Sequence, residues 1–356
     1  MTRAIVAQRS RTPRSALRTV AQASLNGMLA PVKRDLEAVS ERVLSQLADP
    51  IARMVVYLVT AGGKRLRPAL VLLAGASGHS PQRDALVDTA TAVELIHTAT
   101  LIHDDIVDES TLRRQQPTFH HRWGTERAVL MGDYLYATAF TLLTRLQIPF
   151  VMQVLAEVCQ QLSRGELREV EARFRLDLTE AEYLEIIRDK TASLFAGCCR
   201  SGAYLGGLAG GQVEQLGAFG ERFGLAFQIM DDCLDLTGDP RELGKSVLAD
   251  LDKGALSLPI IYLSQRLSRR ERDRLFAPLR APSAPQTRWR AGTHATDPAF
   301  LRRLARAAKE SGAIAQAQER ARAFVQLAQE TVAGLPLNGL SHTYQRLADY
   351  AVSRRS

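Results

Sequence analysis

Two acidic triplets are the residues of this chain best suited to chemistry. Each has the pattern Asp-Asp-x-x-Asp, and together they comprise Asp104, Asp105, Asp108, Asp231, Asp232 and Asp235. Residues four apart share one face of a helix, so the first and last aspartate of each triplet would stack and repel each other. Both triplets follow strongly apolar segments, where an uncompensated carboxylate is costly. The pattern therefore predicts a compensating positive charge at each triplet.

Divalent cations would supply that charge. Mg²⁺ prefers oxygen ligands and typically binds through one or two carboxylates together with substrate phosphates. Two triplets that face each other would hold a metal cluster with one side open to a diphosphate. The alternative for each triplet is a solvated acidic face, or pairing with nearby arginines. The occurrence of the same pattern twice favours the metal interpretation.

Basic residues in three regions would complete such a site. They are Lys64, Arg65, Arg67, Arg113, Arg114, Lys190, Lys245 and Lys253. The first three lie in the Gly-rich segment "GGKRLRP", where a flexible backbone and rigid guanidinium forks suit phosphate. Any one of the lysines could be an ordinary surface charge. Together, these residues predict a cleft with cations around two phosphate sites.

Two histidines lie in the apolar segment before the first triplet. His97 is seven residues before Asp104 and therefore lies near the same helical face, two turns away. This makes His97 the better ligand candidate. For His103, a satisfied core histidine and a ligand both remain open.

Helical periodicity dominates the rest of the chain. One apolar stripe steps by three or four residues through Leu36, Val39, Val43, Leu47, Ile51, Val55 and Leu58. The segment 89–102 is apolar on nearly every face, which predicts a central buried helix. The alternation typical of strands is scarce. We expect one all-α domain over 31–356, after a basic, flexible extension over 1–30, with a Pro-rich surface loop over 277–298.

Composition narrows the function classes without choosing among them. The 356 residues are 46% hydrophobic and 24% charged, with a formal net charge of +8. A basic surplus favours an anionic partner, which could be nucleic acid, a membrane surface or a phosphorylated small molecule. The four cysteines form no CxxC pair, so zinc and disulfides are not expected and a reducing cytoplasm fits.

Two further expectations concern membranes and targeting. The chain has no run of 18 apolar residues, so we expect no membrane-spanning helix. The first 34 residues are basic and contain no acidic residue, which fits a disordered extension or an organellar transit peptide. We expect a cytoplasmic location, with the transit peptide left open.

Six segments of the chain together resemble a known family. The chain is similar to the trans-isoprenyl (polyprenyl) diphosphate synthases, and to their long-chain branch, in six ordered blocks: "GGKRLRP", "ELIHTATLIHDDIVDESTLRRQQPT", "WGTERAVLMGDYLYA", "IIRDKTASLF", "FQIMDDCLDLTGD" and "LGKSVLADLDKGALSLP". The resemblance runs from about residue 35 to the end and is strongest between 60 and 260. It implies a single all-α domain of antiparallel helices around a deep central cavity, a homodimer, and three Mg²⁺ ions in each active site.

The resemblance also implies roles for matching residues. All six aspartates of the triplets would bind Mg²⁺, and the first triplet would also bind an allylic diphosphate primer. The other contacts to that diphosphate would come from Arg113, Lys190 and Lys245, with Thr191 and Gln228 lining the site. The diphosphate of isopentenyl diphosphate would be held by Lys64, Arg67, His97 and Arg114. The residues that we expect to be catalytic are Asp104, Asp105, Asp108, Asp231, Asp232, Lys190 and Lys245.

The chain departs from the family at several positions after each triplet. Gln115 replaces the Gly of an Arg-Arg-Gly sequence, and Leu248 replaces a Gly that commonly follows "GK". Ala255 stands where a Lys is common and Ser257 where a Thr is common, although Lys253 lies nearby and is counted as substrate-binding. These changes leave the metal ligands intact. We expect them to affect the rate of the reaction more than its type.

Product length follows from the residues one turn before the first triplet. Ala99 and Thr100 are small, whereas a Phe or Tyr there would block a growing chain, as in the short-chain branch. We therefore expect an all-trans product longer than farnesyl diphosphate that serves as a quinone side-chain precursor. In the alternative, Ala99 is a helix-packing residue and a bulky residue of the next helix limits the chain. The product would then be of farnesyl or geranylgeranyl length.

Three other functions remain as competitors. They are a non-catalytic subunit of a heteromeric synthase, a terpene cyclase of the same general fold, and a nucleic-acid binder. The first typically lacks one triplet and the second usually has an Asn/Ser/Glu motif in place of the second triplet. The third leaves the aspartates unexplained, so we expect no nucleic-acid partner. A peripheral membrane contact for product release is a further expectation.

Overall fold

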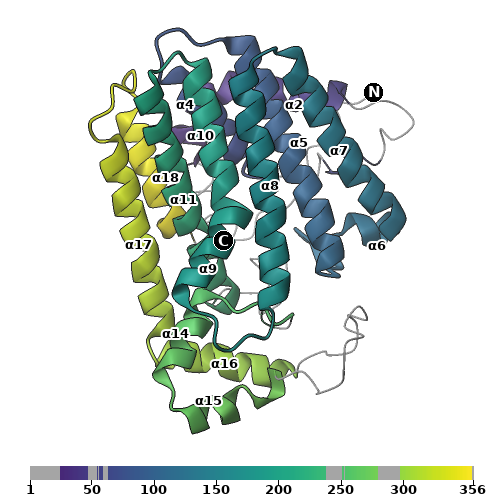
Figure 1. Ribbon diagram of the computed structural model, residues 1–356, viewed down its shortest axis with the longest axis vertical. Helices are drawn as coiled ribbons and strands as arrows, with labels where there is room; N and C mark the ends of the chain where they lie inside the picture. The colour runs from purple at the N-terminus through teal and green to yellow at the C-terminus, as the bar shows by residue number, and fades with distance from the viewer. Residues whose placement is uncertain are drawn as a thin grey trace, which may run out of the picture.

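The chain folds into a bundle of helices, seen in the computed structural model of Figure 1. The structure describes residues 25–46, 54, 56–58, 63–237, 251, 253–279 and 297–354. The α-helices are α2 (Lys33–Ser45), α4 (Leu66–Ala76), α5 (Arg83–Val107), α6 (Phe119–Trp123), α7 (Thr125–Arg145), α8 (Pro149–Ala172), α9 (Glu180–Ile187), α10 (Ser193–Leu205), α11 (Gly210–Thr237), α14 (Leu258–Arg266), α15 (Arg269–Leu275), α16 (Pro298–Glu310), α17 (Ala313–Val332) and α18 (Ser341–Ser353). Short elements are the 3-10 helices η1 (Ala30–Val32) and η3 (Ala277–Leu279), and the π-helix η2 (Arg188–Ala192). The all-α prediction is confirmed.

The centre of the bundle is formed by α4, α5, α10 and α11. Helix α10 packs against α4, α8 and α11, while α5 packs against α4 and α7. Outside them, α17 covers α11 along one side of the molecule and α7 covers α5 on the other (Figure 1). The segment 89–102 lies in α5, one of these central helices, and its residues Val93 and Ile96 are completely buried. The two helices that end in the acidic triplets, α5 and α11, thus belong to the rigid core.

One helix of the described residues, α5, is long and apolar enough to cross a membrane by length and composition. However, 61% of its most apolar window is buried inside the protein. The core helix of a soluble protein passes the same test, so the finding is weak support for a span.

The predicted domain boundaries need adjustment at the N-terminal end. Residues 25–28 are already helical, and Leu25, Met28 and Leu29 are buried in the hydrophobic core. The folded domain therefore begins before residue 31, and residues 1–24 lie outside the described part. Of the expected surface loop over 277–298, the described ends form η3 and the start of α16, while 280–296 lie outside the described residues. The apolar stripe over 36–58 is helical in α2 and at its described later positions.

A two-stranded hairpin follows the first triplet. The sequence did not predict this hairpin. Strands β1 (Leu112–Arg113) and β2 (Gln116–Pro117) pair antiparallel, with Arg113 opposite Gln116. The two turn residues, Arg114 and Gln115, have φ values of 52° and 64°. Both therefore occupy the left-handed region, in which the tight two-residue hairpin turn prefers Gly or Asn. The hairpin turns Arg113 back toward the end of α5.

Candidate active site

The first triplet lies at the C-terminal end of α5, and cations from other elements surround it. Asp105 is buried and accepts a hydrogen bond from Arg113 Nε at 2.8 Å. Asp108, which caps the helix, accepts one from Arg173 Nη2 at 2.8 Å. Its other oxygen lies 3.4 Å from Lys253 Nζ. The hairpin and the segments after α8 and before α14 therefore converge on this triplet.

The second triplet lies in the last two turns of α11. Asp232 is buried and accepts hydrogen bonds from Tyr183 Oη at 2.7 Å and from Gln228 Nε2 at 2.8 Å. Asp231 forms an ion pair with Arg354 at 2.6 Å, and Asp235 is buried. The second triplet is thus held by α9, by its own helix and by the C-terminal end of the chain.

The π-helix η2 lies between the surroundings of the two triplets and makes polar contacts on both sides. On the side of the first triplet, Lys190 Nζ donates to Glu166 of α8 at 3.0 Å, and the positive charge of Lys190 lowers the pKa of Asp104 against the effect of burial. The next residue, Thr191, donates a hydrogen bond at 2.9 Å to Gln228 Oε1. Since Gln228 in turn binds Asp232, Thr191 is connected to the second triplet through one side chain. That these residues share one site with the first triplet stays a prediction.

The backbone of η2 reaches this position because two glycines lie beside it. A Cβ atom added to Gly165 of α8 would lie 2.4 Å from the backbone N of Lys190. One added to Gly224 of α11 would lie 2.6 Å from Cα of Ala192. The π-helix is therefore wedged between two helices that each lack a side chain at the contact. Single π turns within α-helices frequently mark functional sites, and this one presents Lys190 and Thr191 to the triplets.

Carboxylates outnumber the cations around Lys190. Its Nζ also contacts Glu169, at 2.5 Å, and Asp104 and Asp108 are nearby. Burial raises the pKa of Asp104 to about 6 and that of Glu166 to about 7, against the opposing effect of Lys190.

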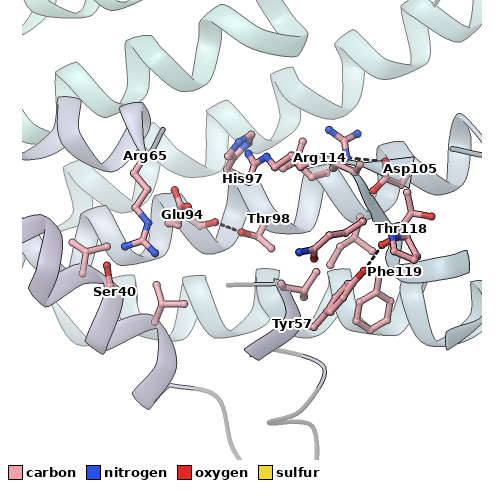
Figure 2. Close-up of a pocket in the computed structure, with 18 residues that line it drawn as sticks. Ser40, Tyr57, Arg65, Glu94, His97, Thr98, Asp105, Arg114, Thr118 and Phe119 are labelled. Carbon is pink, nitrogen blue, oxygen red and sulfur yellow. Dashed lines mark hydrogen bonds and ion pairs between the residues drawn. The ribbon is translucent and has the colours of Figure 1, made fainter. Parts of the chain in front are cut away.

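The second predicted phosphate site lies beside the first triplet, around the Gly-rich loop (Figure 2). Arg67 Nη1 lies 3.1 Å from His97 Nε2, and its guanidinium lies 4.4 Å from the centre of the Phe195 ring. Burial and the neighbouring arginines lower the pKa of His97 well below its usual value, so its ring is neutral and Nε2 accepts the bond. Arg114 packs over Gly63, so it lies at the loop that leads into α4 and Arg67.

A pocket extends from this cluster between α2 and α5. Figure 2 shows Arg65, Glu94, His97, Arg114 and Asp105 along one side of it. Its other lining residues are mostly apolar and include Val39, Val43, Leu58, Leu101, Ile102 and Phe119. Glu94 was not a candidate from the sequence. Its carboxylate lies among Arg65, Arg67 and Arg114, but burial outweighs them and raises its pKa.

The remaining candidates fall into three groups. His103 leans on Gly132 of α7 and lies 3.2 Å from the carbonyl oxygen of Val129, so it is a helix-contact residue. Ala99 is completely buried, and the Thr100 hydroxyl donates to the carbonyl of His97 at 2.8 Å. Neither lines the pocket of Figure 2, so their role in product length stays a prediction. Lys245 and Leu248 lie outside the described residues.

Sequence reasoning missed several residues of the site, namely Glu94, Glu166, Glu169, Arg173, Tyr183 and Arg354. A signal existed for one pair: Glu166 and Glu169 are three apart, directly after Gly165, and thus share a helical face. Tyr183 and Arg354 reach the site only through the fold. Nothing in their local sequence marks them.

The donor set fits hard divalent cations. It consists of carboxylate oxygens, which Mg²⁺ and Ca²⁺ prefer over nitrogen or sulfur. Among the described residues, no three His, Cys, Asp or Glu side chains converge on one point ready to hold an ion. Instead, Asp105, Asp108 and Asp231 are paired with arginines. A metal would bind by exchange with these cations, and phosphate oxygens would complete its coordination.

Comparisons with known proteins agree with this arrangement. A family model described as polyprenyl synthetase matches residues 48–289. A heptaprenyl diphosphate synthase component 2 from Geobacillus stearothermophilus is 34% identical over 93% of this chain and 99% of its own length. A polyprenyl synthase from Caulobacter crescentus, solved in complex with calcium and isoprenyl diphosphate, has a TM-score of 0.83 at 32% identity and covers 93% and 98% of the two chains. A decaprenyl diphosphate synthase from Rhodobacter capsulatus has the same score and identity, over 93% and 99%.

Proposed function

Because the chain belongs to the polyprenyl synthetase family, we propose that it is a trans-type prenyltransferase that condenses isopentenyl diphosphate with an allylic diphosphate. Successive head-to-tail additions would give an all-trans polyprenyl diphosphate. The observation that carries the proposal is the position of η2, where Lys190 acts on Asp104 and the next residue, Thr191, is linked through Gln228 to Asp232. It supports one shared site for two triplets that lie more than a hundred residues apart.

The family uses a divalent metal, and we propose that it is Mg²⁺, with three ions in each site held by the six aspartates. Bound there, the metal would neutralise the charge that develops on the leaving diphosphate. Lys190 and Arg113 are already fixed by carboxylates at the edge of this site. Preorganised cations of this kind stabilise a departing anion without reorganising at the moment of reaction. Lys245 and Lys253 would act with them.

The second substrate would bind at the loop cluster. There, Lys64, Arg67 and Arg114 would hold the diphosphate of isopentenyl diphosphate. Neutral His97, which accepts a hydrogen bond from Arg67, keeps that guanidinium aimed at one place without adding charge. Holding two anionic substrates side by side is a proximity effect. No side chain needs to act as general base if the departing diphosphate takes the final proton.

The finer features of the function are part of the same proposal. The product is longer than farnesyl diphosphate and serves as a quinone side-chain precursor. The enzyme is a cytoplasmic homodimer that touches a membrane surface when the product leaves. The long-chain relatives and the small side chains of Ala99 and Thr100 support the product length.

A second candidate is a component of a heteromeric synthase. The Geobacillus relative, similar over nearly the whole chain, is named as one component of its enzyme. Against a non-catalytic role stands the presence of both triplets. The two candidates differ in whether the chain acts alone.

The test is an incubation of the purified chain with labelled isopentenyl diphosphate, a series of allylic primers and Mg²⁺, followed by sizing of the prenyl products. We expect linear products beyond fifteen carbons, and their loss in Asp104→Ala and Asp231→Ala variants. An inactive chain would favour the heteromeric component. Cyclic products, formed from the allylic primer alone, would overturn the assignment.

A further inference from the structure

The C-terminal end of the chain contributes an arginine to the second triplet. Arg354 directly follows α18, and its side chain is only 2% exposed. Its Nη1 lies 2.6 Å from Asp231 Oδ1, and its guanidinium lies 3.6 Å from the centre of the Phe227 ring. Nη2 donates to the carbonyl oxygen of Phe227, and Nε donates to that of Ala351 at 3.0 Å. The guanidinium is thus stacked and hydrogen-bonded on several sides.

This end of α18 also touches the loop of the other phosphate site. Lys64 Nζ lies 5.7 Å from the centre of the Tyr350 ring, one turn before Arg354. The last turn of α18 therefore lies between the Gly-rich loop and the end of α11. A movement of the Gly-rich loop or of the end of α11 would therefore also move this turn.

The pair between Arg354 and Asp231 is asymmetric in a way that suits exchange. Arg354 is buried, whereas the side chain of Asp231 is 44% exposed. A buried guanidinium needs an anionic or carbonyl partner, because leaving its charge uncompensated is costly. Asp231 has no such need, since water can solvate it. A divalent cation arriving from solvent could therefore reach Asp231 and displace the arginine from it.

We propose that Arg354 is a positioning residue that holds Asp231 in the metal-free enzyme and competes with the divalent cation for this carboxylate. The proposal rests on the proposed role of the second triplet as a metal site. Metal binding would break the ion pair and loosen the last turn of α18 from α11. Coupling between two binding events is reciprocal, so removing Arg354 should make metal binding at the second triplet tighter.

The test measures Mn²⁺ binding to the substrate-free full chain by electron paramagnetic resonance. Arg354→Gln removes the charge and keeps a hydrogen-bonding side chain, and it should bind Mn²⁺ about fivefold more tightly, the low end of typical coupling between sites. Arg354→Lys keeps the charge and should bind as the wild type does. Arg322→Gln is the matched control, because Arg322 is exposed and pairs with Glu319 at 2.6 Å on α17. It should leave the affinity unchanged.

The same measurement in an Asp231→Asn background shows whether Arg354 affects Mn²⁺ binding through Asp231. There, Arg354→Gln should no longer change Mn²⁺ affinity, because the competing carboxylate is gone. Equal affinities of wild type and Arg354→Gln, or a difference that persists in the Asp231→Asn background, would overturn the proposal.

Hydrogen exchange on the wild-type chain covers the case in which Arg354→Gln does not fold. Saturating Mn²⁺ should speed amide exchange over 350–354, and unchanged or slower exchange would contradict the proposal. The binding data are also independent of turnover. A chain that makes no prenyl product but shows the difference in affinity fails only the proposed function, whereas an active chain without that difference fails only this inference.

Discussion

Replacing Gly165 by alanine should damage the site more than the fold, and the structure gives the size of both effects. The added Cβ would lie 2.4 Å from the backbone N of Lys190 and 2.8 Å from its Cα, so the backbone of η2 must move. In a helix interior, replacing Gly by Ala by itself raises the unfolding free energy by about 1 kcal/mol. Overpacking a tight contact costs about 1–3 kcal/mol. We expect a net loss of roughly 0–2 kcal/mol in unfolding free energy.

The effect on catalysis should be larger, because Lys190 moves with its backbone. A misplacement of about 1 Å at a reacting centre can cost roughly 100-fold in rate. We therefore expect kcat of Gly165→Ala to fall about 100-fold, with the urea midpoint only slightly lowered. Gly211→Ala is the matched control, since Gly211 lies in α11 with nothing within 4 Å of the added Cβ. A Gly165→Ala variant as stable and active as wild type would refute the account of η2.

Three further changes test other parts of the site. Gln115→Gly should raise the unfolding free energy by about 1 kcal/mol in urea titrations, because Gln115 has a φ of 64°, which glycine adopts without strain; a loss of stability would contradict this. The metal-free chain should lose stability from about pH 5 to about pH 7, because folding raises the pKa of Glu166 to about 7 and the folded state keeps a proton that the unfolded chain releases. Glu166→Gln should flatten that slope in thermal melts, and an unchanged slope would assign it elsewhere. Ala99→Phe should shorten the prenyl product, and an unchanged length would refute the placement of the growing chain beside Ala99.

Repeated local patterns made much of the site predictable. The two triplets were visible because carboxylates at helical spacing after apolar segments need a counter-charge, and the structure pairs Asp105, Asp108 and Asp231 with arginines. The segment around Lys190 was found by resemblance. Its π-turn was not predicted, because it depends on Gly165 and Gly224, which lie in two other helices. A single sequence does not show which distant glycines will meet.

The features that the sequence did not predict have different physical causes. The hairpin after the first triplet is only two residues long on each side, and its turn carries Arg114 and Gln115 instead of the usual turn residues. Arg354 acts through packing of α18 on α11, a contact between segments more than a hundred residues apart. The early start of the core at Leu25 escaped because a basic composition masked a short apolar helix. The positions of Arg354 and Leu25 thus depend on long-range packing, whereas the hairpin was missed because of its unusual turn residues.

Anomalous diffraction would show whether the two triplets bind one metal–diphosphate unit. Crystals of the full chain would be grown with Mn²⁺ and an unreactive thio-analogue of an allylic diphosphate. The account predicts manganese peaks between Asp104 and Asp108 on one side and Asp231 on the other, around a single diphosphate. Peaks confined to one triplet, or on separate surfaces with no diphosphate between them, would contradict it.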